Sequence, residues 1–402
     1  MAQDGADGRL AAVDFTGRRG TLFGILLRGY LLMVPTLGIY RFWLATWKRR
    51  FYWSNTVIDG DPLEYTGTPL QLLVGFLFAL AIFLPLYLLF FYLSTQNADV
   101  VLLGYAAVGT IFWFMMGYAI YRARDFRLSR TLWRGIRFDQ GGSAWIYALR
   151  RFLWSILMIL TLGLVYPFMA VSLWRYRCRN TWYGDRQASF AGSWKQLAGP
   201  YYLGYFVAVA CLVATVVVGS ASGAFVFVEG FVIPSAPVVG MALLSALVIG
   251  LFVCAYQARE ISRMYSSMRL GDAILTVKIR GRSLFGLYLR FGACLLALVV
   301  ALNIAGAVVI VVLVRDGDFD LGWVAGIFAN QFTSFIPLLA YLFAAAVLSL
   351  LAELFISYGF WRLVARNAAI AGVESLRSVR ARQEDDALAG EGLADALNVG
   401  AY

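Results

Sequence analysis

Glu353 is the residue of this sequence with the clearest chemical potential, because it is an acidic side chain inside a long apolar run, 335–360. It precedes Trp361 by eight residues, which places it about 12 Å along a helix axis from the basic end of that run. Carboxylates at such a depth act as proton relays or ion ligands in membrane proteins. The alternative is structural, because antiparallel packing of 285–314 against 335–360 would bring Arg290 within about a turn as an ion-pair partner.

Two further polar residues are candidates for the same pathway. Asn303 lies near the middle of the run 285–314, where an amide either bonds to a neighbouring helix or lines a path. Arg28 lies in a shorter apolar segment, and its guanidinium either reaches lipid headgroups or coordinates an anionic ligand. We therefore group Glu353, Asn303, Arg290 and Arg28 as residues of a hypothetical substrate or ion pathway.

A second kind of chemistry is indicated by the run 122–138, where arginines alternate with aromatic residues. Arg124, Arg127, Arg130 and Trp133 are its candidates for contact with lipid headgroups. Anionic phospholipid is the expected partner, because a basic patch attracts it by about 1 kcal/mol per basic residue. The formal net charge is +11, but basic loops on one side of a membrane already explain this excess, so nucleic-acid binding is not expected.

Catalysis has little support in the sequence. Histidine is absent, which removes the usual general base near neutral pH and the commonest metal ligand. Cys178, Cys211, Cys254 and Cys294 show no CxxC spacing, and the three that lie inside apolar runs, Cys211, Cys254 and Cys294, are expected to be small buried hydrophobes. The nucleophile elbow, the phosphate-binding loop and the zinc-protease motif are also missing from the sequence. We expect no enzyme, no metal site and no cofactor.

Membrane helices are the elements that must position these residues. The chain has 402 residues, of which 61% are hydrophobic and 14% charged, whereas soluble domains carry roughly 25% charged residues. A helix needs about 20 apolar residues to cross a bilayer. Six runs reach or exceed that length: 70–94, 100–121, 201–219, 236–256, 285–314 and 335–360. Residues 1–19 are polar and lack the apolar segment of a cleavable signal peptide.

Basic residues gather at one set of helix ends. The loops 95–99 and 220–235 contain no Lys or Arg, and 315–334 contains only Arg315. Basic clusters flank the opposite ends of the apolar runs, in 48–50, 122–137, 175–186, 259–282 and 362–382. Because basic loops remain in the cytoplasm, we expect these clusters and both termini on the cytoplasmic side.

Two shorter apolar segments, 22–47 and 148–174, share a motif that recurs as Thr36-Leu37-Gly38 and Thr161-Leu162-Gly163. A single crossing would put the basic clusters on either side of each segment in different compartments. A helical hairpin that enters and returns keeps them together, and glycine tolerates the positive φ of a tight reversal. We expect two hairpins whose turns are shielded by protein; a kinked single span is the alternative.

Short polar segments between the helical hairpins have the alternation and glycine turns typical of β-hairpins. One of them turns at Asp59-Gly60-Asp61, which suits a two-residue turn with positive φ. Val13–Gly17 and Asn367–Gly372 resemble the two halves of a further unit, so a strand at one terminus could pair with one at the other and close a ring. Independent amphipathic loops are the alternative.

These patterns predict the class of a polytopic α-helical membrane protein. It would have six long transmembrane helices, two short Thr-Leu-Gly hairpins and small cytoplasmic β-hairpins between the helical hairpins. A single membrane domain would cover 12–377, with internal repeats over 12–75, 136–200 and 277–372. Residues 1–11 and 378–402 lack the pattern and are expected to be flexible tails.

The residues around the first Thr-Leu-Gly resemble a known family. They are Phe15, Gly17, Thr36, Leu37, Gly38, Ile39, Tyr40, Trp43, Asn55, Thr56, Tyr65 and Gly67. Together they are similar to the YjgN-like family of bacterial inner-membrane proteins, over roughly residues 12–370. The resemblance implies a multi-pass protein of the bacterial inner membrane, and it brings no activity, substrate or catalytic residue. We interpret Thr36, Leu37, Gly38, Tyr40, Trp43, Asn55, Thr56 and Gly67 as structural.

Two functions remain compatible with the sequence. The first is a transport-like role for a small solute or ion, because broken helices at matching positions of repeats point to a translocation site. The second is a non-transporting scaffold or anionic-lipid-binding protein, which the basic, aromatic cytoplasmic segments favour.

Overall fold

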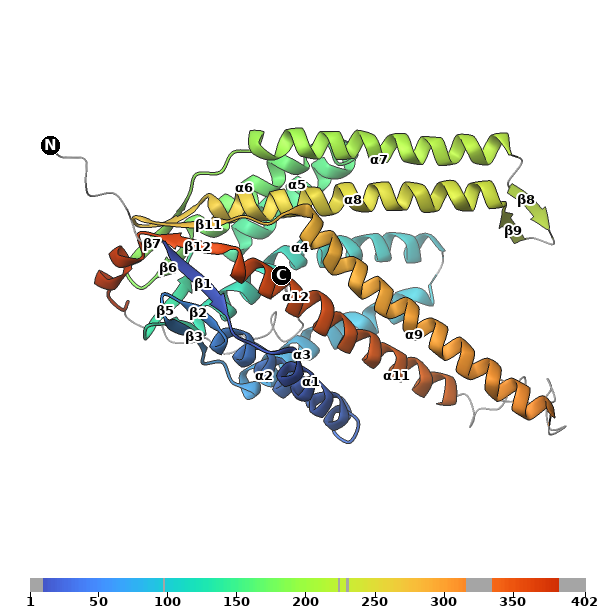
Figure 1. Ribbon diagram of the computed structural model, residues 1–402, viewed down its shortest axis with the longest axis horizontal. Coiled ribbons are helices and arrows are strands. Elements are labelled where there is room, and N and C mark those ends of the chain that lie inside the picture. Colours follow the sequence, from blue (N-terminus) through green and yellow to red (C-terminus); the bar gives the residue numbers. More distant parts are fainter. Residues whose placement is uncertain (1–9, 97, 223–224, 229–230, 316–334, 383–402) are drawn as a thin grey trace.

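The computed structural model describes residues 10–96, 98–222, 225–228, 231–315 and 335–382. Most of the two predicted tails, 1–9 and 383–402, lies outside the described residues. Most strands gather at one end of the molecule and the helices extend away from them, with one further strand pair at the opposite end (Figure 1). The fold is therefore a layer of strands with a layer of helices on one side.

Helices follow one another in pairs along the described chain. They are α1 (Arg19–Met33), α2 (Arg41–Ser54), α3 (Pro69–Ser94), α4 (Ala98–Ser129), α5 (Ala144–Leu160), α6 (Tyr166–Arg179), α7 (Lys195–Ala221), α8 (Ala236–Ser266), α9 (Gly281–Arg315), α11 (Phe335–Ala352) and α12 (Tyr358–Arg366). A π-helical turn, η1 (Glu353–Ser357), joins α11 to α12. A 3-10 helix, η2 (Val373–Ser378), follows the last strand.

Six helical segments in the described part of the chain are long and apolar enough to cross a membrane. They are Pro69–Ser94, Asp99–Ser129, Lys195–Ala221, Ala236–Ser266, Gly281–Val308 and Tyr341–Arg366. These segments overlap the six apolar runs of the sequence. The two remaining helical pairs, α1–α2 and α5–α6, are the shorter ones that carry the Thr-Leu-Gly motif at their reversal.

Ten strands of the described residues form one closed antiparallel barrel. They are β1 (Ala11–Phe15), β2 (Thr56–Ile58), β3 (Asp61–Tyr65), β4 (Thr131–Trp133), β5 (Ile136–Gln140), β6 (Thr181–Tyr183), β7 (Arg186–Phe190), β10 (Met268–Leu270), β11 (Ala273–Val277) and β12 (Ala368–Ala371). Two further strands, β8 (Phe225–Val228) and β9 (Phe231–Pro234), pair with each other between α7 and α8.

The closed barrel makes the predicted fold class wrong, because a helical membrane protein with only small β-hairpins has no such sheet. Strands of three residues carry little information about long-range pairing, and an isolated two-stranded hairpin is marginal in water. Closure removes every unpaired strand edge. One finer expectation is confirmed: β1 pairs with β12, with Ala11 opposite Ile370, so the two ends of the described chain complete the ring.

The two rims of the barrel differ. At one rim, consecutive strands are joined by tight turns with positive φ, at Asp59-Gly60, Arg134-Gly135, Gly184 and Gly271. At the other rim, each of the remaining neighbouring strand pairs is connected through a helical hairpin, as β1 is to β2 through α1 and α2. This alternation directs the helices away from a single rim.

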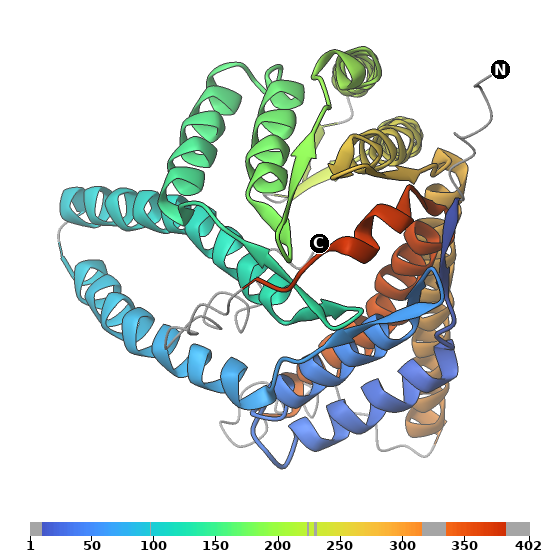
Figure 2. The same ribbon diagram turned by 90° about the vertical axis from the view of Figure 1, so that its left-hand side faces the viewer.

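The barrel is filled by side chains. Trp133 and Tyr183 lie in its core, together with Val373, Leu376 and Val379 from the segment that follows β12. Figure 2 shows this segment, drawn in red, in the middle of the ring of strands. The predicted tail therefore begins with residues packed against the barrel, because Val379 is buried.

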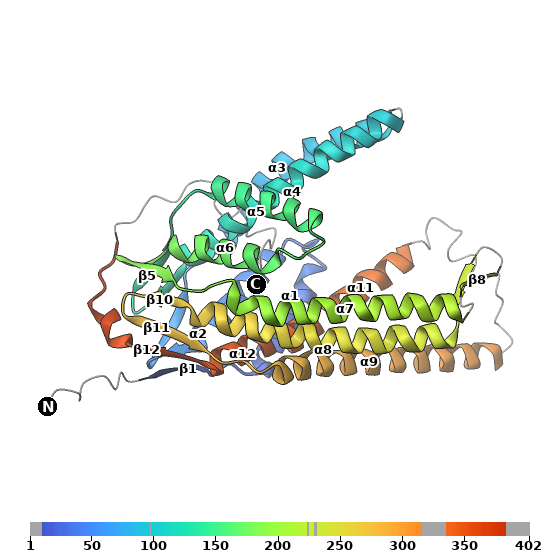
Figure 3. The same cartoon turned by 90° about the horizontal axis from the view of Figure 1, so that it is seen from above.

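The helical hairpins form a ring on one side of the barrel. Each packs against its neighbours: α2 against α3, α4 against α5, α6 against α7, α8 against α9, and α1 against α11. Figure 2 shows the pairs arranged around the barrel, and in Figure 3 α3 and α4 diverge from α7, α8 and α9. Many apolar side chains on the long helices are exposed, for example Leu102 and Phe206, as a lipid-facing surface requires.

Candidate functional site

The Thr-Leu-Gly motif is a helix-ending turn. The Thr36 hydroxyl donates to the carbonyl of Leu32 at 2.7 Å, and the Gly38 amide donates to the carbonyl of Met33 at 2.8 Å. Leu37 and Gly38 both have positive φ, which glycine adopts readily and leucine does not. The chain therefore reverses between α1 and α2 as a hairpin, and the kinked single span is wrong.

The second copy repeats this geometry and shows how its turn is shielded. The Thr161 hydroxyl donates to Leu157, and the Gly163 amide to Met158. Three tyrosines of α7 donate to turn carbonyls: Tyr201 to Gly163 at 2.8 Å, Tyr202 to Leu164 at 3.0 Å, and Tyr205 to Leu162 at 3.0 Å. Such partners are necessary for non-helical backbone in an apolar setting.

The other motif residues join helix ends to the barrel. The Asn55 amide donates to Phe51, and the Thr56 hydroxyl donates to Tyr52. Gly67 lies against the ring of Tyr65, which a Cβ atom would overlap, and its carbonyl accepts from Arg50 at 3.3 Å. Tyr40 stacks on Trp43 with 6.1 Å between ring centroids. These contacts support the structural interpretation of the motif.

Glu353 forms the core of the candidate site. Its Oε2 lies 3.1 Å from Nζ of Lys48, and its Oε1 accepts a hydrogen bond from the Tyr52 hydroxyl at 3.1 Å. Ser349 lies one helical turn before Glu353, and its hydroxyl accepts a 2.7 Å hydrogen bond from the Tyr30 hydroxyl. The first hairpin thus supplies both partners of Glu353, and the predicted pairing with Arg290 is wrong.

The backbone at this place is also unusual. Glu353 is the first residue of the π-helical turn η1, inside the candidate span Tyr341–Arg366. A π turn inserts one residue into a helix and is frequent at functional sites. The side chain of Glu353 is 13% exposed and that of Lys48 is 31% exposed. The site therefore combines an ionisable pair, partial access and a locally altered helix.

The other residues of the hypothetical pathway lie apart from Glu353. Arg290 and Arg28 are exposed on α9 and α1. Asn303 is exposed, and its amide donates to the carbonyl of Val299 in its own helix at 2.7 Å. The structure therefore does not bring these three residues together with the carboxylate. Lys48 and Tyr52, which complete the site, were missed because Lys48 belongs to a basic cluster that the positive-inside rule already explained.

The predicted headgroup residues have different surroundings. Arg124 is directed at the barrel, where its Nη1 donates to Gln140 at 2.6 Å and to Thr181 at 3.0 Å. Trp133 is buried in the barrel core at 2% exposure. Arg130 and Arg127 are partly buried at the end of α4, with the Arg130 guanidinium 5.5 Å from the ring centroid of Phe126.

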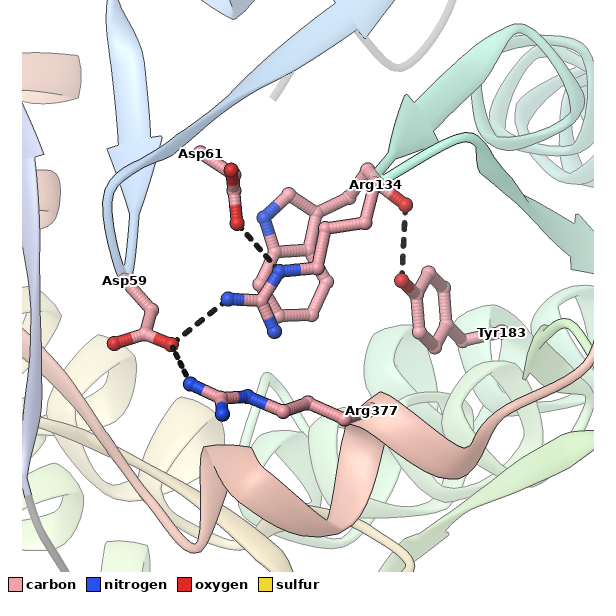
Figure 4. Close-up of polar contacts among 6 residues, drawn as sticks. Asp59, Asp61, Arg134, Tyr183 and Arg377 are labelled. Carbon is pink, nitrogen blue, oxygen red and sulfur yellow. Dashed lines mark hydrogen bonds and ion pairs between the residues drawn. The ribbon is translucent and has the colours of Figure 1, made fainter.

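An ion-pair cluster lies at the turn rim of the barrel. Arg134 bonds to Asp61 at 2.5 Å and to Asp59 at 2.8 Å, and Arg377 of η2 approaches Asp59 at 3.9 Å (Figure 4). Burial alone would lower the pKa of Arg134, but its bonds to the two carboxylates outweigh that effect and raise it. Burial raises the pKa of Tyr183, which donates to the Trp133 carbonyl, to about 12.

The fold and the site define a class: a multi-pass membrane protein whose helical hairpins are tied together by a closed β-barrel and hold a charged pair beside a π turn. Within the described residues, no group of three His, Cys, Asp or Glu side chains is arranged to hold a metal ion. The chain belongs to the family described as "Bacterial protein of unknown function (DUF898)", whose model matches residues 11–396.

The sequence is also similar to the inner membrane protein YjgN of Salmonella typhimurium (strain LT2), with 34% identity over 70 residues. The matched region is 17% of this chain and 18% of the relative, so the match covers less than a fifth of the relative's length. No solved structure matches the chain. The predicted family resemblance is confirmed, and the six candidate spans of the described residues support a multi-pass membrane protein.

Proposed function

We propose that this protein has a transport-like function, in which a small solute or ion passes beside Glu353 and Lys48. The observation that carries the proposal is the collection of a carboxylate, an ammonium group and a phenol at a π-helical turn within a candidate span. Ionisable side chains inside membrane segments are costly and mark ion or proton pathways.

The pair has the properties of a site that exchanges partners. Lys48 and Glu353 come from hairpins at opposite ends of the chain, and both retain partial exposure. A proton or cation that binds the carboxylate competes with the ammonium group, which weakens the contact between the two hairpins. Binding at this place would therefore change how α2 lies against η1.

Orientation follows the same proposal. The helix ends next to the barrel carry the basic clusters. Under the positive-inside rule, the barrel and both termini therefore face the cytoplasm. Labelling of a Ser54→Cys variant with a membrane-impermeant thiol reagent tests this. Protection in intact cells is expected, and labelling from the periplasm would contradict the orientation.

Reconstituted protein tests the transport proposal. Liposomes that enclose a pH-sensitive dye report proton entry under an imposed potential, and sodium and potassium gradients extend the test to cations. We expect flux above that of empty liposomes, and at least about a tenfold loss in Glu353→Gln, because a titratable charge is removed from the pathway. Glu374→Gln, which removes an exposed carboxylate on η2, is the matched control and should keep full flux. Absence of all flux, or equal flux in Glu353→Gln, would refute the proposal.

A second candidate is a non-transporting scaffold that binds anionic phospholipid. The tips of the two short hairpins favour it, because Leu37 is 93% exposed and Leu162 is 79% exposed. Leucine at positive φ on a protein surface suits a tip embedded in lipid. On this proposal, Leu37→Asp with Leu162→Asp would release the protein's bound lipid, and the wild type would show no ion flux above that of empty liposomes.

A further inference from the structure

A group of hydrogen-bond donors lies where α4 and α6 meet the barrel. The side chains of Arg124 and Arg177 are both half-buried, and they lie near enough for their two positive charges to repel each other. The Arg177 guanidinium also stacks over the Trp174 ring, 4.9 Å from its centroid. Two like charges held together inside a protein destabilise it unless a negative group lies between them.

Buried donors at this place lack acceptors. Nε of Arg177 and Nε2 of Gln140 are buried and have no hydrogen-bond partner. Arginine is a donor only, so Gln140 must present its oxygen to Arg124; its amide nitrogen then faces the Tyr121 hydroxyl without a hydrogen bond of good geometry. An unpartnered buried donor costs roughly 1–3 kcal/mol, which a ligand that supplies oxygen atoms would recover.

The carboxylates nearby are engaged elsewhere. Glu260 is the acidic residue that acts electrostatically on Arg177, but its two oxygens accept from the Tyr166 hydroxyl at 3.2 and 3.3 Å. Asp125 pairs with Arg122 at 3.0 Å. Within the described residues, no carboxylate forms an ion pair with Arg124 or Arg177, so neither guanidinium is in direct contact with a carboxylate oxygen.

We propose that Arg124, Arg177 and Gln140 form a binding site for an oxyanion of the phosphate class. Guanidinium groups bind such anions through charge-assisted hydrogen bonds, and Gln140 adds a neutral donor that fixes orientation. Free phosphate or phosphate ester, or the phosphate of a lipid headgroup, supplies this chemistry. The proposal is independent of the Lys48–Glu353 pair and goes beyond the transport-like function.

The thermal unfolding temperature of the purified full chain in detergent tests the site. Inorganic phosphate should raise it above the value in chloride at equal ionic strength. Arg177→Gln should need at least about ten times more phosphate for half the effect, because a hydrogen bond to a charged group contributes about 1.5 kcal/mol or more. Arg179→Gln removes an exposed charge from the same helix and should respond as the wild type does.

Gln140→Glu keeps the acceptor for Arg124 and adds a permanent carboxylate. This variant should be at least as stable as the wild type without phosphate and should lose the response to phosphate. A destabilised Gln140→Glu variant, or one that responds to phosphate like the wild type, would overturn the proposal.

Native mass spectrometry distinguishes the two sources of the anion. If phosphate has no effect on the wild type because a lipid occupies the site, phosphatidylglycerol should remain bound to the wild type and to Arg179→Gln but not to Gln140→Glu. That result supports a lipid headgroup as ligand. Equal lipid retention in all three proteins, together with no phosphate effect, would refute the site.

Discussion

Trp361 and Thr56 lie 305 residues apart in the sequence, and the indole Nε1 of Trp361 donates a 2.9 Å hydrogen bond to the Thr56 hydroxyl. The same kind of link recurs around the barrel, from Trp53 to Thr131 at 2.8 Å and from Arg124 to Thr181 at 3.0 Å. In each case the second helix of one hairpin bonds to the first strand residue that follows the next hairpin. Neighbouring units therefore interlock where helices meet the barrel.

Loss of one such link should weaken the closed ring. Trp361→Phe removes the donor and leaves the Thr56 hydroxyl, which is buried, with one partner fewer. We expect a loss of about 1 kcal/mol in unfolding free energy, measured as a lower thermal unfolding temperature. Trp47→Phe is the control, because Trp47 is 48% exposed. Equal effects of the two substitutions would show that the link contributes nothing specific.

The Tyr65-x-Gly67 motif should behave as a steric pair. A Cβ atom on Gly67 overlaps the ring of Tyr65, so Gly67→Ala should cost about 1–3 kcal/mol, as overpacking usually does. Tyr65→Leu combined with Gly67→Ala should recover part of this loss in a thermal unfolding assay. Gly20→Ala, at a position with open space around it, serves as the neutral control. No recovery in the double variant would contradict the steric explanation.

Substitution of Arg134 should lower the unfolding temperature through both an electrostatic and a conformational effect. It bonds to Asp59 and Asp61, and its φ of 51° is one that asparagine tolerates better than other side chains. Arg134→Gln and Arg134→Asn both lose the ion pairs, and we expect Arg134→Asn to unfold at the higher temperature. Arg377→Gln should change little, because that side chain is 64% exposed and 3.9 Å from Asp59. The reverse order of the two Arg134 variants would exclude the conformational contribution.

Local signals in the sequence predicted the local structure. The Thr-Leu-Gly turns were predictable because their glycines need positive φ, and the pairing of the terminal strands was predictable because Val13–Gly17 and Asn367–Gly372 resemble halves of one unit. The closed barrel was not predicted as the fold class, because its short strands are defined by pairing with partners that are distant in sequence.

Side-chain direction explains what the sequence missed at the sites. Spacing along antiparallel helices suggested Arg290 as the partner of Glu353, but the carboxylate, at the first residue of the π turn, pairs with Lys48 of α2 instead. Arg124 belonged to a run that was interpreted as a lipid-facing patch, and only its orientation toward Gln140 distinguishes it. Neither direction is encoded in residue type or spacing alone.

Disulfide trapping across the closing strands tests the central claim, that the two ends of the chain complete one barrel. Ala12 is opposite Ala369, and directly opposed residues of antiparallel strands have Cα atoms about 4.5–5.5 Å apart, within the range of a disulfide. In a chain whose native cysteines are replaced by serine, Ala12→Cys with Ala369→Cys should form a cross-linked peptide on oxidation. Ala12→Cys with Thr276→Cys, two strands apart, should not. Absence of the first cross-link, or equal yields of both, would contradict the closed barrel.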